Sequence, residues 1–165
     1  MNINDFKGSF NELARNSLFK VDFSGHGING RNFQFRCKAS SLPGTTFTPV
    51  EVPYMGRKIK IPGDREYEAW TTTVLLDEDY SLHAELYNWA NDINGTTSNV
   101  TTGDLNSLKA DGIITTLKRD GSNGISYKVV GMWPSAVGPV ELTWDGGSEP
   151  AEVEITWEVD YFEIN

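Results

Sequence analysis

The sequence predicts a mainly β protein, a small barrel or sandwich of about eight antiparallel strands with one packed α-helix and a long projecting hairpin. Three observations lead to this prediction. Short segments along most of the chain alternate between apolar and polar side chains, as strands with one buried face do. Aromatic residues make up 12% of the chain and include five tryptophans, and such rings pack well on pleated sheets. Beyond the N-terminal residues, a single segment has clear helical spacing.

The C-terminal fifteen residues carry the clearest strand pattern. Odd positions from Val153 to Tyr161 are apolar or aromatic, and the even positions between them are polar or acidic. A strand of about ten residues spans roughly 33 Å, so we expect it to be the main element of the sheet. Its polar face carries an acidic row, which is either an ordinary solvated edge or a surface for a partner. The row consists of Glu152, Glu154, Glu158 and Asp160.

Length and composition limit the possible classes. A chain of 165 residues fits one domain, 1–165, which removes roughly 70% of its unfolded surface from water. Cys37 is the one cysteine, so an internal disulfide is impossible. His26 and His83 lie far apart, so we expect no metal site and no cofactor. No apolar run is long enough for a membrane span and no signal peptide is recognisable, so we expect folding in a cytoplasm.

The net charge of −9 argues against a protein that grips nucleic acid, because such proteins neutralise phosphates with Lys and Arg. It is compatible with a surface that nucleic acid slides past.

The N-terminal part is expected to contain an arm and two strands. In the arm, 1–16, Phe6, Phe10, Leu13 and Ala14 have the spacing of one or two amphipathic turns, although an arm that orders against a neighbour is equally compatible. Alternation predicts a strand over Phe19–Phe23 and a second over Arg31–Lys38.

The glycine-rich segment between these two strands matches the G-x-G-x-x-G pattern of dinucleotide-binding proteins. It runs from Gly25 to Gly30, with Glu51 about 20 residues further on. That motif requires a helix whose N-terminus holds the pyrophosphate. Because the following residues alternate with period two, we interpret the glycines as a hairpin turn.

Residues 39–63 are extended but interrupted by prolines, which cannot donate to a central β-ladder. We expect a projecting ribbon that partner subunits would order, and the alternative is an ordinary pair of surface loops. The candidate assembly residues of this ribbon are Leu42, Pro43, Gly44, Val50, Val52 and Tyr54.

The middle of the chain predicts a strand, the helix and a long loop. The strand covers Glu66–Leu76, with Trp70, Thr72 and Val74 on one face. The helix covers 79–92. Asp77, Glu78 and Asp79 lie where it begins, and their negative charge favours a helix start. Its apolar residues recur at helical spacing. Residues 94–112 are rich in Gly, Thr and Ser, which predicts a loop. The apolar helix residues are Leu82, Leu86 and Trp89.

The rest of the chain predicts strands joined by turns. Ile113–Arg119 and Ile125–Gly131 flank a Gly-rich turn and are typical of a hairpin. Met132–Ser135 is expected to end the second strand, and Val140–Trp144 alternates like a further strand.

Several of these segments, in this order, resemble the tail tube proteins of T4-like contractile phages, which have the Hcp-like tube fold. The resemblance covers about residues 18–163; the Gly25 to Gly30 turn and the loop 94–112 depart from it. The matching segments are Leu18–Val21, Phe35–Ala39, Leu42-Pro43, Arg57–Lys60, Gly63-Asp64-Arg65, Trp70–Val74, Gly131–Pro134, Val137-Gly138, Trp144-Asp145 and Val159–Tyr161.

The resemblance implies a structural virion protein that assembles in the host cytoplasm. Such proteins form six-membered rings whose inner sheets join into one barrel, and the rings stack into a hollow tube inside a contractile sheath. Implied partners are further copies of the chain, the sheath, baseplate and tail-terminator proteins, and a tape-measure protein in the lumen. DNA passes without tight binding. The acidic row would face either the lumen or the sheath, and we favour the sheath because the central hairpins usually build the inner wall.

Other classes of protein share the fold or some of these residue types. A tube-initiating or terminating paralogue, or a tube protein of a type VI secretion-like machine, would share the fold. A carbohydrate-binding β-sandwich would also use exposed aromatic residues. A glycoside hydrolase needs two carboxylates in a cleft, and the sequence shows no acid–base pair or nucleophile, so we expect no enzyme.

Overall fold

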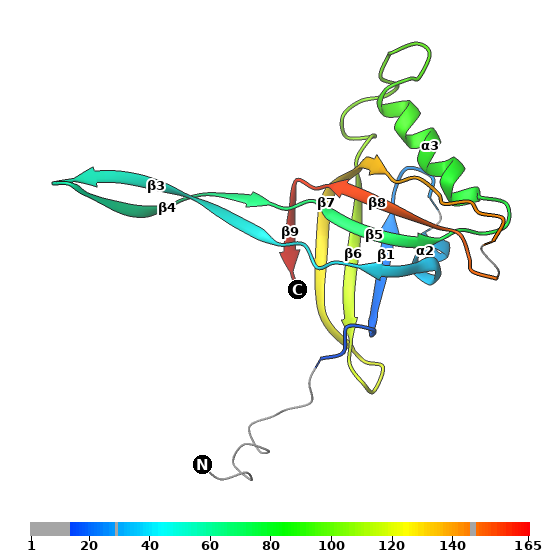
Figure 1. Ribbon diagram of the computed structural model, residues 1–165, viewed down its shortest axis with the longest axis horizontal. Coiled ribbons are helices and arrows are strands. Elements are labelled where there is room, and N and C mark those ends of the chain that lie inside the picture. The colour runs from blue at the N-terminus through cyan, green and yellow to red at the C-terminus, as the bar shows by residue number, and fades with distance from the viewer. Residues whose placement is uncertain (1–13, 29, 146–147) are drawn as a thin grey trace, which may run out of the picture.

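A computed structural model describes residues 14–28, 30–145 and 148–165 of the chain (Figure 1). It confirms the predicted fold class, with two differences: the sheet does not close into a barrel, and a second, short helix is present. The elements are β1 (Phe19–Ser24), α2 (Gly30–Arg36), β2 (Cys37–Ser40), β3 (Thr45–Tyr54), β4 (Arg57–Tyr67), β5 (Trp70–Leu75), α3 (Ser81–Ile93), β6 (Ala110–Leu117), β7 (Asn123–Val137), β8 (Glu152–Glu158) and β9 (Tyr161–Ile164).

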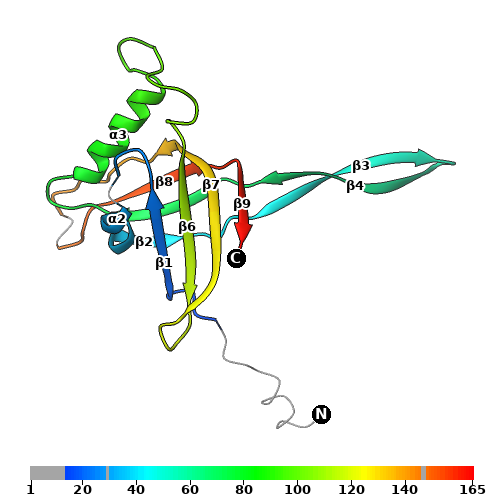
Figure 2. The same cartoon turned by 180° about the vertical axis from the view of Figure 1, so that it is seen from behind.

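One seven-stranded sheet forms the body, in the order β1-β6-β7-β8-β5-β2, with β9 also paired to β7. Every strand pair in the described part of the chain is antiparallel. The first half of β7 pairs with β6 and β9, and its second half pairs with β8. β7 therefore belongs to both halves of a folded sheet, and β1, β6 and β7 run side by side in one of them (Figure 2).

The core lies between the two halves of the sheet and the helices. Trp157 of β8 is fully buried at its centre, and its ring lies 5.4 Å from Phe23, 5.7 Å from Trp89, and 6.2 Å from both Phe33 and Trp70. These rings come from β1, α3, α2 and β5, so one aromatic cluster ties the elements together. The apolar residues predicted for the helix, Leu82, Leu86 and Trp89, are the buried ones.

The strand predicted over Arg31–Lys38 is wrong, because α2 occupies most of it and β2 begins only at Cys37. Phe33 is buried against Phe23, with ring centroids 5.3 Å apart. Phe33 and Cys37 are four residues apart, a spacing that fits a helix as well as a strand, so a pattern this short is ambiguous.

Gly25 and Gly27 have the positive φ angles expected of a turn, 140° and 76°, but the predicted hairpin is wrong, because the helix α2 follows in place of a second strand. Because a helix does follow the glycines, the lack of a helix no longer excludes a dinucleotide motif. However, β1 leads through α2 into β2, which lies at the opposite end of an antiparallel sheet. The parallel βαβ unit that the motif requires is not formed by these elements.

The predicted break at Met132–Ser135 is also wrong, since β7 continues to Val137. Gly131, with φ of 67°, bends the strand, and the pairing with β8 shifts register between Pro134 and Ala136. Proline is tolerated at such an irregularity because the ladder is interrupted there.

The long C-terminal strand is divided in two. β8 ends at Glu158, and β9 begins at Tyr161 on the other half of the sheet. The chain crosses between the halves at Asp160, whose backbone N–H donates to the carbonyl of Val130 at 3.1 Å. The predicted alternation is confirmed in β8, where Val153, Ile155 and Trp157 are buried.

Two further strand predictions need correction. Val140–Trp144 is a loop, because β8 is already paired on both sides, by β7 and β5. The strand predicted from Glu66 begins at Trp70, since Glu66 and Tyr67 belong to β4. The predicted burial of Trp70, Thr72 and Val74 is confirmed.

The predicted projecting hairpin is present as β3 and β4, which pair only with each other and extend far from the body (Figure 1). The loop after α3 ends where β6 begins, at Ala110. The amphipathic turns predicted within 1–16 lie almost entirely outside the described residues.

Candidate assembly surfaces

The hairpin has an apolar face that is exposed in the described part of the chain. Antiparallel pairing places Val50 opposite Ile61, and Val52 opposite Ile59. Alternation puts these four side chains and that of Tyr54 on one face. They are between 41% and 62% exposed, and every residue of β3 is exposed. We call this set the hairpin apolar face.

The opposite face of the hairpin is charged. Glu51 lies opposite Lys60 in the register, and its carboxylate accepts a hydrogen bond from Lys58 Nζ at 2.6 Å. The tip turns at Met55 and Gly56, which have φ angles of 43° and 78°. Two strands alone are marginally stable in water. Contact between the apolar face and another surface would therefore stabilise this hairpin.

Half of the predicted assembly residues belong to this face. Val50, Val52 and Tyr54 project together from β3, whereas Ile59 and Ile61 were not among the predicted residues. The alternation of Ile59 and Ile61 with lysines is visible in the sequence, and pairing the two strands about the Met-Gly turn would have identified them.

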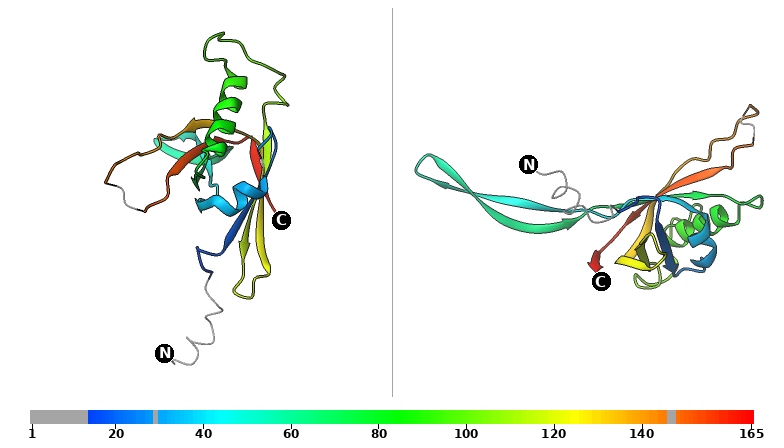
Figure 3. Two further views of the ribbon diagram at one scale, coloured as in Figure 1. Left: turned by 90° about the vertical axis from the view of Figure 1, so that its right-hand side faces the viewer. Right: turned by 90° about the horizontal axis from the view of Figure 1, so that it is seen from below.

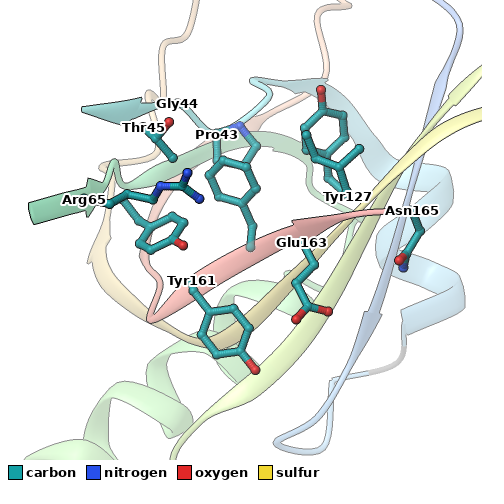
Figure 4. Close-up of a pocket in the computed structure, with 11 residues that line it drawn as sticks. Pro43, Gly44, Thr45, Arg65, Tyr127, Tyr161, Glu163 and Asn165 are labelled. Atoms are coloured by element: carbon teal, nitrogen blue, oxygen red, sulfur yellow. The ribbon is translucent and has the colours of Figure 1, made fainter. Parts of the chain in front are cut away.

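The other three predicted residues lie at the root of the hairpin. Leu42 is 47% exposed, Pro43 is buried, and the carbonyl of Gly44 accepts a hydrogen bond from the Glu68 N–H at 3.1 Å. Pro43 and Gly44 line a surface hollow between the root and β9 (Figure 4). Further lining residues are Thr45, Arg65, Tyr67, Tyr127, Tyr161, Phe162, Glu163, Ile164 and Asn165.

The two ends of the sheet are further candidate surfaces. Among the described strands, β1 has only β6 as a neighbour and β2 has only β5. Unpaired backbone groups on such an edge are a template for another strand. β9 likewise has only β7 as a neighbour, so the described sheet has open edges on β1, β2 and β9 with which other copies can pair.

The acidic row is divided by the break before β9. Glu152, Glu154 and Glu158 are exposed on the outer face of β8, and Glu152 forms an ion pair with Lys38 at 2.7 Å. Asp160 lies at the crossing and pairs with Lys109 at 2.6 Å. Glu154 and Glu158 are therefore the row members that form no ion pair within the described part of the chain.

The perturbed titratable groups have structural roles. Hydrogen bonds from serine hydroxyls and backbone N–H groups hold the pKa values of Asp77, Asp104 and Asp120 below their ordinary value; Asp77 accepts from Ser81 at the start of α3. Burial raises the pKa of the Cys37 thiol to about 11, which keeps it protonated and unreactive.

Within residues 14–28, 30–145 and 148–165, no three His, Cys, Asp or Glu side chains gather as metal ligands would. In the same residues, none of the helices has the length and apolar character needed to cross a bilayer.

An open β-sandwich with free edges and a projecting hairpin is typical of a structural subunit that joins a larger assembly. Comparison with known proteins agrees, since residues 4–165 match the family described as phage tail tube protein. The chain belongs to this family, and the resemblance to tail tube proteins of contractile phages is confirmed. It is a structural component of the virion and not an enzyme.

Individual relatives extend over nearly the whole chain. The chain is 33% identical to tail tube protein gp19 of Enterobacteria phage T4 over 153 residues, covering 92% of each. It is 25% identical to the tail tube protein of Serratia phage KSP90 over 170 residues, covering 98% of this chain and 94% of that one.

Two solved structures share the fold. A chain in the anti-feeding prophage baseplate has a TM-score of 0.72 at 11% identity, with 94% and 97% of the two chains covered. A chain in the sheath-tube complex of an extracellular contractile injection system has a TM-score of 0.67 at 15% identity, with 100% and 98% covered.

Proposed function

We propose that six copies of this chain form a ring, that rings stack into the inner tube of a contractile phage tail, and that the genome passes through the lumen. The single observation that carries the proposal is the open sheet: β1, β2 and β9 each lack a second neighbour in the described residues. Ring closure gives every edge a partner and removes the risk of uncontrolled pairing. The number six follows from the resemblance to contractile tail tube proteins.

The hairpin supplies the contact between rings. A strand of about ten residues reaches roughly 33 Å, and β3 and β4 extend away from the body along its long axis (Figure 1). Covering the hairpin apolar face with a copy in the next ring removes Val50, Val52 and Ile59 from water, which favours stacking.

Other partners follow from the related assemblies. Chains of this fold occur in structures described as a baseplate, a sheath-tube complex and a tube terminating cap. We assign the same classes of partner to this chain, with a tape-measure protein in the lumen before ejection and assembly in the host cytoplasm. The net charge of −9 repels phosphate, so DNA is guided and not held.

Electron microscopy of the purified protein tests the proposal. We expect rings or tubes about 10 nm across, the order of six packed domains of this size. Monomers alone at high concentration, with and without a baseplate seed, would contradict it. Single rings that never stack would instead favour a tube-initiating or terminating paralogue.

The acidic row is proposed to face the sheath. Glu154 and Glu158 are exposed and form no ion pair within the described residues. Weak, screened contacts with basic groups suit a sheath that must release the tube on contraction.

Charge reversal distinguishes the sheath from the lumen. For the variant with Glu154→Lys and Glu158→Lys, we expect normal tubes on which sheath assembly fails. Thr73→Ala, on the neighbouring strand β5, is the control on the same sheet. Normal sheath with slowed genome ejection would place the row in the lumen.

A further inference from the structure

The loop that follows β7, from Gly138 to Asp145, presents an exposed tryptophan to solvent. Trp144 is fully exposed and Leu142 is 77% exposed. Tryptophan side chains are usually largely buried, so a fully exposed one is unusual. Burying the side chain in a contact with a partner would contribute strongly to the binding energy. Val140 of the same loop packs against the core, so the loop is anchored beside the exposed residues.

The charge of this loop is entirely acidic. It contains Glu141 and Asp145 and no Lys or Arg. These carboxylates form no ion pair within the described part of the chain. The surface around Trp144 therefore suits an apolar partner with basic side chains.

The distal part of the hairpin has this complementary chemistry. Arg57, Lys58 and Lys60 outnumber the single acid Glu51 between Pro49 and Pro62, in a chain that is acidic overall. Lys58 is paired with Glu51, whereas Arg57 and Lys60 form no ion pair among the described residues. Arg57 lies opposite Tyr54 in the register, at the outer end of the hairpin apolar face.

The loop and the hairpin cannot meet within one molecule. They lie at opposite ends of its long axis, as Figure 1 and the right-hand view of Figure 3 show. A contact between them joins two copies head to tail and leaves a free hairpin and a free loop at the two ends. Such a heterologous contact either closes into a ring or repeats as an open stack, and the proposed stacking of rings uses the open form.

We propose that the hairpin tip of one copy docks on the loop of a copy in the adjacent ring, with Arg57 against Trp144 and Asp145. The guanidinium lies over the indole ring and pairs with the carboxylate, while Tyr54 covers Leu142. This inference rests on the proposed stacking function and assigns the surface that receives the hairpin.

Substitution and charge exchange test the contact by the mass of sedimentable tubes at fixed protein concentration. Trp144→Ala, Asp145→Arg and Arg57→Glu are each expected to lower it about tenfold or more, as loss of an interface hot spot does. Combining Arg57→Glu with Asp145→Arg restores tubes. The controls, Tyr87→Ala and Glu78→Arg, change exposed residues on and before α3 and leave tube mass unchanged.

A disulfide cross-link gives an independent readout. In a Cys37→Ser background, Met55→Cys at the tip and Thr143→Cys in the loop are expected to yield a ladder of linked chains after oxidation. Met55→Cys with Val100→Cys, in the loop after α3, is expected to yield none. The ladder would establish head-to-tail contact directly.

The outcomes separate this contact from the tube function. Wild-type protein that forms no tubes removes the proposed function. If the wild-type protein forms tubes, two results overturn the contact alone. One is a tube mass of Trp144→Ala and Asp145→Arg equal to that of the wild type. The other is the absence of a ladder from the protein with Met55→Cys and Thr143→Cys. Normal Trp144→Ala tubes that fail to bind sheath assign the loop to the sheath and also overturn it.

Discussion

Strands β3 and β8 have the same alternating pattern but different environments. Val153, Ile155 and Trp157 of β8 are completely buried, whereas Val50, Val52 and Tyr54 of β3 are 53%, 41% and 62% exposed. In β8 the apolar face contacts the protein's own core; in β3 none of the described residues covers it. Alternation shows that one face is to be buried, but it does not show which molecule will bury it.

The neighbours of each strand explain the difference. β8 lies between β7 and β5 and beneath an aromatic cluster, while β3 pairs with β4 alone. The stability of β8 belongs to the monomer, whereas we propose that the stability of the hairpin depends on assembly. Substitutions in the two regions should therefore affect different measurements.

The largest effect on folding is expected from Trp157→Ala. It empties the centre of the aromatic cluster and removes the hydrogen bond from Trp157 Nε1 to Thr72 Oγ1, 2.9 Å long. We expect a loss of about 3–5 kcal/mol in the free energy of unfolding, as for other buried aromatic residues. Urea unfolding followed by circular dichroism measures it. An unchanged midpoint would break the comparison by showing that β8 also depends on assembly.

An intermediate effect is expected from Gly131→Ala, with Gly56→Ala as its matched control. Both glycines have positive φ, 67° and 78°. A Cβ at position 131 meets the Asp160 side chain, whereas one at position 56 meets open space. We expect Gly56→Ala to cost about 1 kcal/mol, because a side chain at positive φ is strained, and Gly131→Ala to cost more, about 2–3 kcal/mol, because its Cβ also meets Asp160. Equal losses by thermal unfolding would show that the bend in β7 is not special.

The smallest effect on folding is expected from Val52→Thr combined with Ile59→Thr on the hairpin apolar face. Both changes keep β-branched side chains, and the residues are already about half exposed. We expect the monomer's free energy of unfolding to change by no more than about 0.5 kcal/mol, while sedimentable tubes are lost. A large loss of monomer stability would mean that the hairpin packs on its own body.

Much of the body could be predicted from the sequence where the pattern was long or repeated. The helix residues Leu82, Leu86 and Trp89 span two turns, so only a helix places them on one face. The buried residues of β5 and β8 followed from strict alternation. Family membership was recognisable because short motifs occur in order along nearly the whole chain.

The remaining elements depend on contacts that a local pattern does not contain. α2 could not be separated from a strand because Phe33 and Cys37 fit both periods. Whether β7 continues past Gly131 depends on β8, which provides the pairing partner from a distant segment. Val140–Trp144 alternates but finds no free edge beside it. At the hairpin, Ile59 and Ile61 needed the register as well as the pattern.

The way the hairpin joins the body determines how the protein carries force. β3 and β4 extend from β2 and β5 through short connections, and β5 runs along the same direction as the hairpin (Figure 1). A pull on the tip is therefore directed lengthwise along β5, whose residues from Trp70 to Leu75 all pair with β8. The backbone hydrogen bonds of that ladder are loaded together in shear and not opened one after another. In the proposed stack of subunits, tension would thus reach the strand that holds Trp157, a fully buried residue.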